Sequence, residues 1–87
     1  MKPIDVFTSK DCPKCEILKK FLTDKGIQFR ERRIDDPENM TDAIMLDIYT
    51  VPAMVKGSRV LRTEEMFSGS SLREDVVLRF IFGDGDE

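Results

Sequence analysis

The residues of this chain best suited to chemistry are its two cysteines, Cys12 and Cys15, which are separated by Pro13 and Lys14. Two thiols at this spacing can form a disulfide and be reduced again, and a thiolate attacks a substrate disulfide by exchange. The 87-residue chain has no histidine, which removes the usual general base and the commonest metal ligand. Thiol–disulfide exchange is therefore the first chemistry to consider.

The position of the pair favours a redox role. Proline is common at the first position of a helix, so Pro13 predicts a helix that begins between the cysteines. The first N–H groups of a helix have no partner within it and carry partial positive charge, so they can stabilise a thiolate at Cys12. Cys15, one turn further on, is then the resolving thiol, which attacks the mixed disulfide and releases the reduced substrate.

Other interpretations of the pair stay open. Zinc usually takes four ligands, and the chain has no further cysteine and no histidine. A dimer could instead hold a metal or an iron–sulfur cluster between two copies of Cys12. A purely structural disulfide explains the pair poorly, because a cross-link between residues so close in sequence constrains little of the unfolded chain.

A second motif, Thr50–Val51–Pro52, precedes a short apolar segment. Proline at the start of a strand is ordinary, since that position need not donate a hydrogen bond to the sheet. The alternative is a cis Val51–Pro52 bond, which marks a specific tight bend. Such a bend beside the cysteines would leave the backbone of Val51 free to pair with an extended substrate.

The elements that must position these residues follow from apolar spacing and turn signals. Strands are expected at residues 4–8, 27–34, 53–56 and 59–62. The first helix is expected from Pro13 to a stop at Gly26. The second follows an Asp36 cap and runs to about residue 49, with an apolar stripe that includes Met40 and Ile44. A capping box of Ser71 and Glu74 is expected to begin the last helix.

This order of elements, β-α-β-α-β-β-α, predicts an α/β fold of thioredoxin type, with a four-stranded mixed sheet flanked by helices. The right-handed crossover gives a parallel pair, and the hairpin at residues 57–58 adds antiparallel strands. A single domain is expected over residues 1–82, followed by an acidic, flexible tail at residues 83–87. Residues 62–70 show no clear pattern.

The composition of the chain argues against two classes of partner, nucleic acids and membranes. Apolar residues make up 40% of the chain and charged residues 36%, with a formal net charge of −3, which argues against binding to nucleic acid. The sequence contains no run of about 18 apolar residues, so no membrane-spanning helix is predicted. The N-terminal residues lack the apolar block and cleavage site of a signal peptide, so we expect a cytoplasmic protein without a membrane partner.

Taken together, the Thr8–Cys15 segment and the Thr50–Pro52 motif resemble the thioredoxin superfamily and, within it, the glutaredoxins. The resemblance implies a dithiol oxidoreductase that donates electrons to protein or small-molecule disulfides. It implies Cys12 as the nucleophile and Cys15 as the resolving thiol. It also implies substrate-binding positions, which are Lys10, Pro13, Val51 and Pro52. Glutathione, or a reductase of the thioredoxin-reductase type, is the implied reductant, and no tightly bound cofactor is expected.

Two departures from these families concern ligands and proton transfer. Many glutaredoxins have tyrosine between the proline and the second cysteine, where this chain has Lys14, and they have a Gly–Gly turn and an acidic residue before the last helix. Here residues 66–71 contain one glycine and no acid, and Ser70 and Ser71 are expected at a helix N-terminus. The buried acid that precedes the cysteines of true thioredoxins is replaced by Val6.

Overall fold

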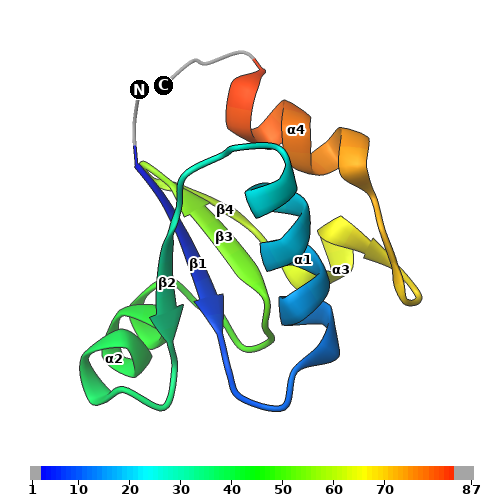
Figure 1. Ribbon diagram of the computed structural model, residues 1–87. Coiled ribbons are helices and arrows are strands. Elements are labelled where there is room, and N and C mark those ends of the chain that lie inside the picture. Colours follow the sequence, from blue (N-terminus) through cyan, green and yellow to red (C-terminus); the bar gives the residue numbers. More distant parts are fainter. Residues whose placement is uncertain (1–2, 84–87) are drawn as a thin grey trace.

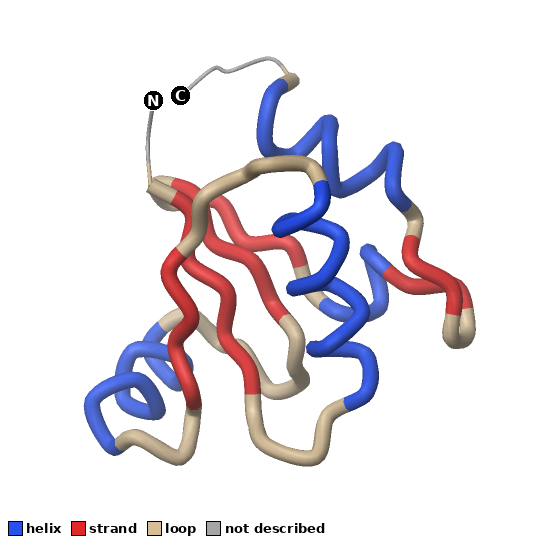
Figure 2. Tube along the Cα trace, viewed as in Figure 1, coloured by secondary structure: helices blue, strands red, loops and turns tan. Residues whose placement is uncertain are grey.

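A computed structural model of the chain describes residues 3–83 and shows a four-stranded sheet with helices on both faces (Figures 1 and 2). The strands of this sheet and the helices that cover it are, in chain order, β1 (Ile4–Thr8), α1 (Pro13–Asp24), β2 (Arg30–Arg33), α2 (Pro37–Met45), β3 (Ala53–Lys56), β4 (Arg59–Leu61) and α4 (Glu74–Phe82). The strand order is β2-β1-β3-β4; β1 and β2 are parallel and the other two pairings are antiparallel. The predicted thioredoxin-like fold class is therefore confirmed.

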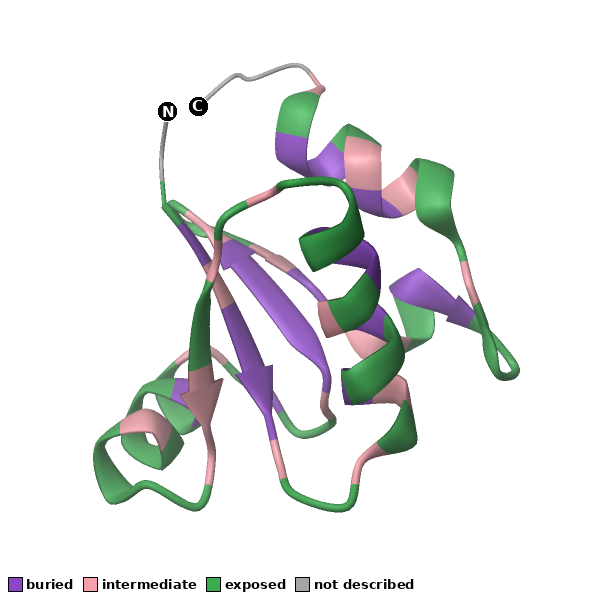
Figure 3. Cartoon of the chain, viewed as in Figure 1, coloured by how far each residue is buried: buried purple, intermediate pink, exposed green. Residues whose placement is uncertain are grey.

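Helices α1 and α4 cover one face of the sheet, and α2 covers part of the other (Figure 1). Successive strand residues point to opposite faces, so β1 supplies both cores. Ile4 and Val6 pack with Leu18 of α1 and Ile81 of α4, whereas Phe7 packs with the α2 side. Figure 3 shows the result: the central strands are buried and the outer helix faces are exposed.

Helix α1 begins and ends as its sequence predicts. Cys12 is the N-cap and Pro13 the first helical residue. At the other end Gly26 has φ +71°, and the N–H groups of Gly26 and Ile27 donate to the carbonyls of Thr23 and Leu22. This pair of bonds satisfies carbonyls that the helix leaves free, and it needs a residue that tolerates positive φ.

Helix α2 ends earlier than predicted, at Met45 instead of residue 49. Its Asp36 cap is as expected, because the carboxylate accepts a hydrogen bond of 2.9 Å from the N–H of Glu38. Asp47 then takes φ +57°, and the N–H of Ile48 donates to the carbonyl of Ala43, which closes the helix as glycine does in α1.

Strand β2 is shorter than the predicted segment 27–34, and all four of its residues are charged. Pairing begins only at Arg30, opposite Asp5, because the chain before it is still turning out of α1. Arg30 and Arg32 each form an ion pair of 3.1 Å with Asp5, and Arg32 also pairs with Asp42. The Arg32 guanidinium lies 5.0 Å from the centre of the Phe7 ring, so it covers apolar surface that α2 leaves open.

The segment without a clear pattern, residues 62–70, and the two residues after it form three short elements. They are α3 (Thr63–Met66), β5 (Phe67–Ser68) and β6 (Ser71–Leu72). The prediction that Ser71 begins the last helix is wrong, because Ser71 pairs with Ser68 in a hairpin whose turn contains Gly69 at φ +63°. Helix α4 starts at Glu74 after an N-cap at Arg73, whose side chain makes no capping bond. Ser70 and Ser71 thus lie in the hairpin and not at a helix N-terminus.

No helix within residues 3–83 combines the length and the apolar character needed to cross a membrane. Of the acidic tail predicted at residues 83–87, all but Gly83 lies outside the described residues.

Candidate functional site

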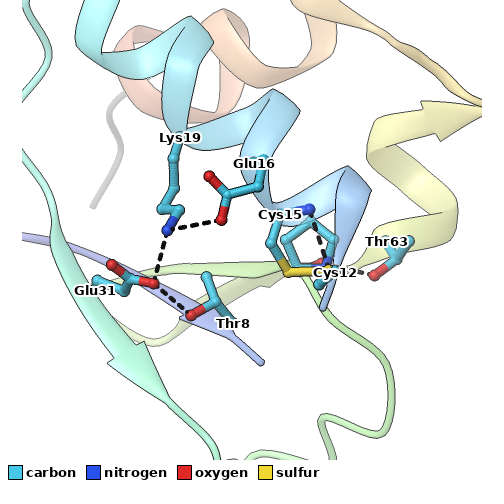
Figure 4. The surroundings of a disulfide bond; sticks show 8 residues. Thr8, Cys12, Cys15, Glu16, Lys19, Glu31 and Thr63 are labelled. Carbon is cyan, nitrogen blue, oxygen red and sulfur yellow. Dashed lines mark hydrogen bonds and ion pairs between the residues drawn. A yellow bond between two sulfur atoms is a disulfide. The ribbon is translucent and has the colours of Figure 1, made fainter. Parts of the chain in front are cut away.

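Cys12 and Cys15 form a disulfide at the start of α1, with their Cα atoms 5.2 Å apart (Figure 4). The backbone N–H of Cys15 donates a hydrogen bond of 3.1 Å to Sγ of Cys12. This contact is the one expected of an N-cap, with sulfur in place of the usual oxygen acceptor. A helix N–H group is therefore already directed at the sulfur that would carry negative charge after reduction.

The two sulfurs differ in access to solvent. Cys15 is completely buried, whereas Cys12 is half-buried at the end of the loop that follows β1. A disulfide of another molecule can therefore approach Cys12 but not Cys15. This difference fits the order of attack expected from their positions on the helix.

Charged residues lie on both sides of Cys12 in the chain. Lys10 is exposed in the loop, and Asp11 holds φ +56°, a conformation more often taken by glycine or asparagine. Lys14 is half-buried, with its Nζ atom 5.6 Å from the centre of the Phe67 ring in β5. The lysine between the cysteines is thus linked to the hairpin that sequence patterns did not predict. Pro13 is exposed.

The Val51–Pro52 bond is cis, the second of the two alternatives that the sequence left open. Pro52 is buried, Val51 is half-buried, and the hydroxyl of Thr63 donates a hydrogen bond of 2.6 Å to the carbonyl of Pro52. Because Phe7 is paired with Ala53, this turn and the Cys12 loop leave the sheet at the same end (Figure 1). The fold therefore brings together the two motifs singled out by the sequence, which lie far apart along the chain.

A polar network next to the disulfide was not predicted (Figure 4). The hydroxyl of Thr8, a fully buried residue, donates a hydrogen bond of 2.8 Å to Oε2 of Glu31. Nζ of Lys19 donates to the same oxygen at 3.0 Å and also lies 3.2 Å from Glu16. The pattern Ile4, Val6, Thr8 carried a signal for it, since alternation places a hydroxyl on the core face at the end of β1.

The hydrogen bonds of this network shift the pKa values of Glu31 and Lys19. Burial on its own would raise the pKa of Glu31, but the hydrogen bonds from Lys19 and Thr8 outweigh it and lower that pKa below its ordinary value. The hydrogen bond to Glu31 in turn raises the pKa of Lys19. Glu31 is therefore a stable carboxylate near neutral pH, on the same face of the sheet as α1.

Within residues 3–83, no group of three or more histidine, cysteine or acidic side chains is arranged to hold a metal ion. In the disulfide state both sulfurs are bonded to each other and are not thiolate ligands.

Comparisons with known proteins agree with this architecture. The model of the family described as glutaredoxin matches residues 4–60, about two thirds of the chain and including both motifs. The crystal structure of a T8A mutant of the thioredoxin-like protein BC3987 is similar, with a TM-score of 0.72 and 21% identity over 90% of this chain and 97% of that chain. The structure of BC3987 itself gives a TM-score of 0.66 and 22% identity over 87% and 96%. No curated protein matches this chain in sequence.

Proposed function

Because this chain belongs to the glutaredoxin family, we propose that it is a dithiol oxidoreductase that reduces protein or small-molecule disulfides as an electron donor. Its Cys12–Cys15 disulfide is consistent with thiol–disulfide redox chemistry. The observation that carries the proposal is the unequal burial of two bonded sulfurs at a helix N-terminus, with a helix N–H donating to the more accessible one.

The proposed cycle starts from the reduced protein. The thiolate of Cys12 attacks one sulfur of the substrate disulfide, so that a mixed disulfide forms and the other substrate thiolate leaves. The thiolate of Cys15 then attacks Sγ of Cys12, which forms the Cys12–Cys15 bond and releases the second substrate thiolate. The two electrons come from the dithiol, and two protons from the protein or solvent complete the substrate thiols.

Other residues have proposed roles in holding the substrate. The backbone of Val51 pairs with the extended substrate beside its cysteine, and Pro52 keeps that backbone at the edge of the site. Lys10 attracts a substrate carboxylate, and Pro13 forms the exposed surface between the two sulfurs. These roles rest on family resemblance together with the placement of both motifs at one end of the sheet.

The oxidised protein needs two electrons to return to the dithiol. Two molecules of glutathione supply them and form glutathione disulfide, or a reductase of the thioredoxin-reductase type does so. This cycle requires a reducing compartment, which supports the cytoplasm as the proposed location.

Two single substitutions test the proposal. Cys12→Ser is expected to reduce the rate of disulfide reduction to the uncatalysed background. Cys15→Ser is expected to keep the first attack and accumulate a mixed disulfide on Cys12, detected as a mass increase equal to the bound substrate. Cys15→Ala repeats the measurement without a hydroxyl at the buried position, and far-UV circular dichroism verifies folding of each variant. Turnover that survives in Cys12→Ser would reject the proposal.

A further inference from the structure

An apolar groove lies on the face of the sheet opposite α1, at the end where the cysteines are. It has a volume of about 200 Å³ and is enclosed almost entirely by apolar side chains. These side chains come from α2, from the end of β2 and from the turn before β3, and they include Ile34, Met40, Ile44, Tyr49 and Val51. Such a volume accommodates one large apolar side chain from another molecule.

The groove is the centre of an exposed apolar patch. Six large apolar side chains are exposed within residues 3–83, and four of them belong to α2 and the loop after it. Met40 is 40% exposed, Ile44 57%, Met45 78% and Tyr49 80%. The apolar stripe of this helix suggested that Met40 fills the core, and this is wrong, because Ala43 is the one residue of α2 that is fully buried. A concentrated apolar patch of this kind is typical of an interaction site.

The charge of the residues around this patch indicates the kind of partner that fits it. Residues 34–55 include five acids, Asp35, Asp36, Glu38, Asp42 and Asp47, and no lysine or arginine. Arg33 and Arg32 from β2 pair with Asp35 and Asp42. The other three acids are in no ion pair among the described residues. Arg62 donates to the carbonyls of Leu46 and Asp47, so three arginines face five acids and the region around the groove keeps a net negative charge. A basic partner is favoured there, and an anionic one such as glutathione is disfavoured.

The groove shares one residue, Val51, with the proposed substrate-binding positions of the redox site. Val51 lines the groove, and its neighbour Pro52 lies in the turn at the same end of the sheet as the Cys12 loop. An extended segment advances about 3.3 Å per residue. A segment whose cysteine has reacted with Cys12 can therefore pass along Val51 and reach the groove within a few residues.

We propose that this groove receives a large apolar side chain of a disulfide-bearing protein, a few residues from the reacting cysteine and next to a basic residue. The inference rests on the proposed function and names its substrate class. Glutathione has no large apolar side chain and is therefore not the molecule that fills the groove. Proteins with an apolar and basic sequence around their disulfide are the substrates.

Cyclic peptides with one internal disulfide test the groove. They share an arginine and differ only by leucine or serine at one position three residues from a cysteine. The measured quantity is the second-order rate constant for oxidation of the pre-reduced protein by each peptide. The wild-type protein is expected to react about tenfold faster with the leucine peptide, the effect of burying one apolar side chain.

Two variants identify the surface responsible. Ile44→Ser removes a wall of the groove and is expected to abolish the preference for leucine. Met45→Ser is the matched control, because Met45 is exposed on the same helix but does not line the groove. Both variants are expected to react with hydroxyethyl disulfide at the wild-type rate, which also shows that they fold.

The possible failures are distinguishable. Equal rates for the two peptides, or a leucine preference that persists in Ile44→Ser, would overturn the groove assignment alone. A wild-type dimer that Ile44→Ser converts to a monomer would assign the groove to a second copy of the chain and overturn it too. No reaction with any disulfide, hydroxyethyl disulfide included, would overturn the proposed function and the groove assignment with it.

Discussion

Glu31 connects three elements beside the disulfide. Its carboxylate accepts hydrogen bonds from Thr8 at the end of β1 and from Lys19 in α1, while its own backbone belongs to β2. The buried hydroxyl of Thr8 needs this acceptor, because an unpaired polar group in the core is costly. The contact therefore fixes the end of β1, from which the Cys12 loop departs.

Replacing Glu31 by glutamine is expected to lower the free energy of unfolding at pH 7 by about 1 kcal/mol, through loss of the ion pair with Lys19. The pKa of Glu31 is lower in the folded protein, so its stabilising contribution is present above the unfolded pKa and lost as pH falls through the folded value. Urea unfolding of the wild type and Glu31→Gln at pH 7 and pH 3 measures the difference in their free energies of unfolding. This difference is expected to be smaller at pH 3 than at pH 7.

Glu64→Gln is the control for that experiment, since it alters an exposed acid in α3. It is expected to change the stability little at either pH. A Glu31→Gln penalty that is the same at pH 3 as at pH 7 would show that the lost ion pair is not its cause.

At the scale of elements, the two helix C-termini show when the sequence specifies a helix end and when it does not. Gly26 was identified as the stop of α1 because glycine alone adopts positive φ without cost, and the structure confirms it. The end of α2 was missed because Asp47 takes the same conformation, and aspartate is a far weaker signal for it. The apolar stripe of α2 therefore predicts a longer and more buried helix than the structure has.

Substituting Gly26 tests this account of the α1 terminus. A Cβ atom at Gly26 would have no heavy atom within 4 Å, so the cost of Gly26→Ala is conformational and not steric. We expect Gly26→Ala to lower the free energy of unfolding by about 1 kcal/mol and Gly26→Asn by less, since asparagine tolerates positive φ better. Chemical denaturation of the wild type and the two variants measures the order of their free energies of unfolding. Equal stability of the alanine variant and the wild type would contradict it.

Local sequence predicted the large elements and both motifs but not the short ones. Strands β1 and β3 were placed correctly because apolar runs bounded by turn signals are unambiguous. Strands β5 and β6 have two residues each, with serines, and no period can be recognised over that length. The contact of Lys14 with Phe67 depends on β5, and that of Thr63 with Pro52 depends on α3. The proximity of residues 63–72 to the two motifs is therefore visible only in the fold.

At the scale of the whole molecule, charge is unevenly distributed. Residues 34–55 carry a formal charge of −5, so the remainder of the chain carries +2 although the total is −3. The negative region surrounds the groove, whereas Lys10 and Lys14 lie beside the cysteines. One surface can therefore favour a basic protein while another favours the carboxylates of glutathione.

This distribution predicts a selective effect of salt. Raising the ionic strength from about 0.01 M to 1 M shortens the screening length from about 30 Å to 3 Å. The rate constant for the arginine–leucine peptide is expected to fall several-fold, whereas that for uncharged hydroxyethyl disulfide is expected to stay constant. Stopped-flow measurements across this range compare the two. Parallel loss of both rates would point to a general effect of salt on the dithiol instead.

The four charges of β2 have a consequence for the behaviour of concentrated solutions. Strand β2 is one edge of the sheet, and an unprotected edge offers backbone groups to which another sheet can add. Arg30, Glu31, Arg32 and Arg33 are already engaged with acids or a lysine of their own chain, and a further strand would have to desolvate them. The side chains that attach this edge strand to the molecule thereby also protect it against edge-to-edge aggregation.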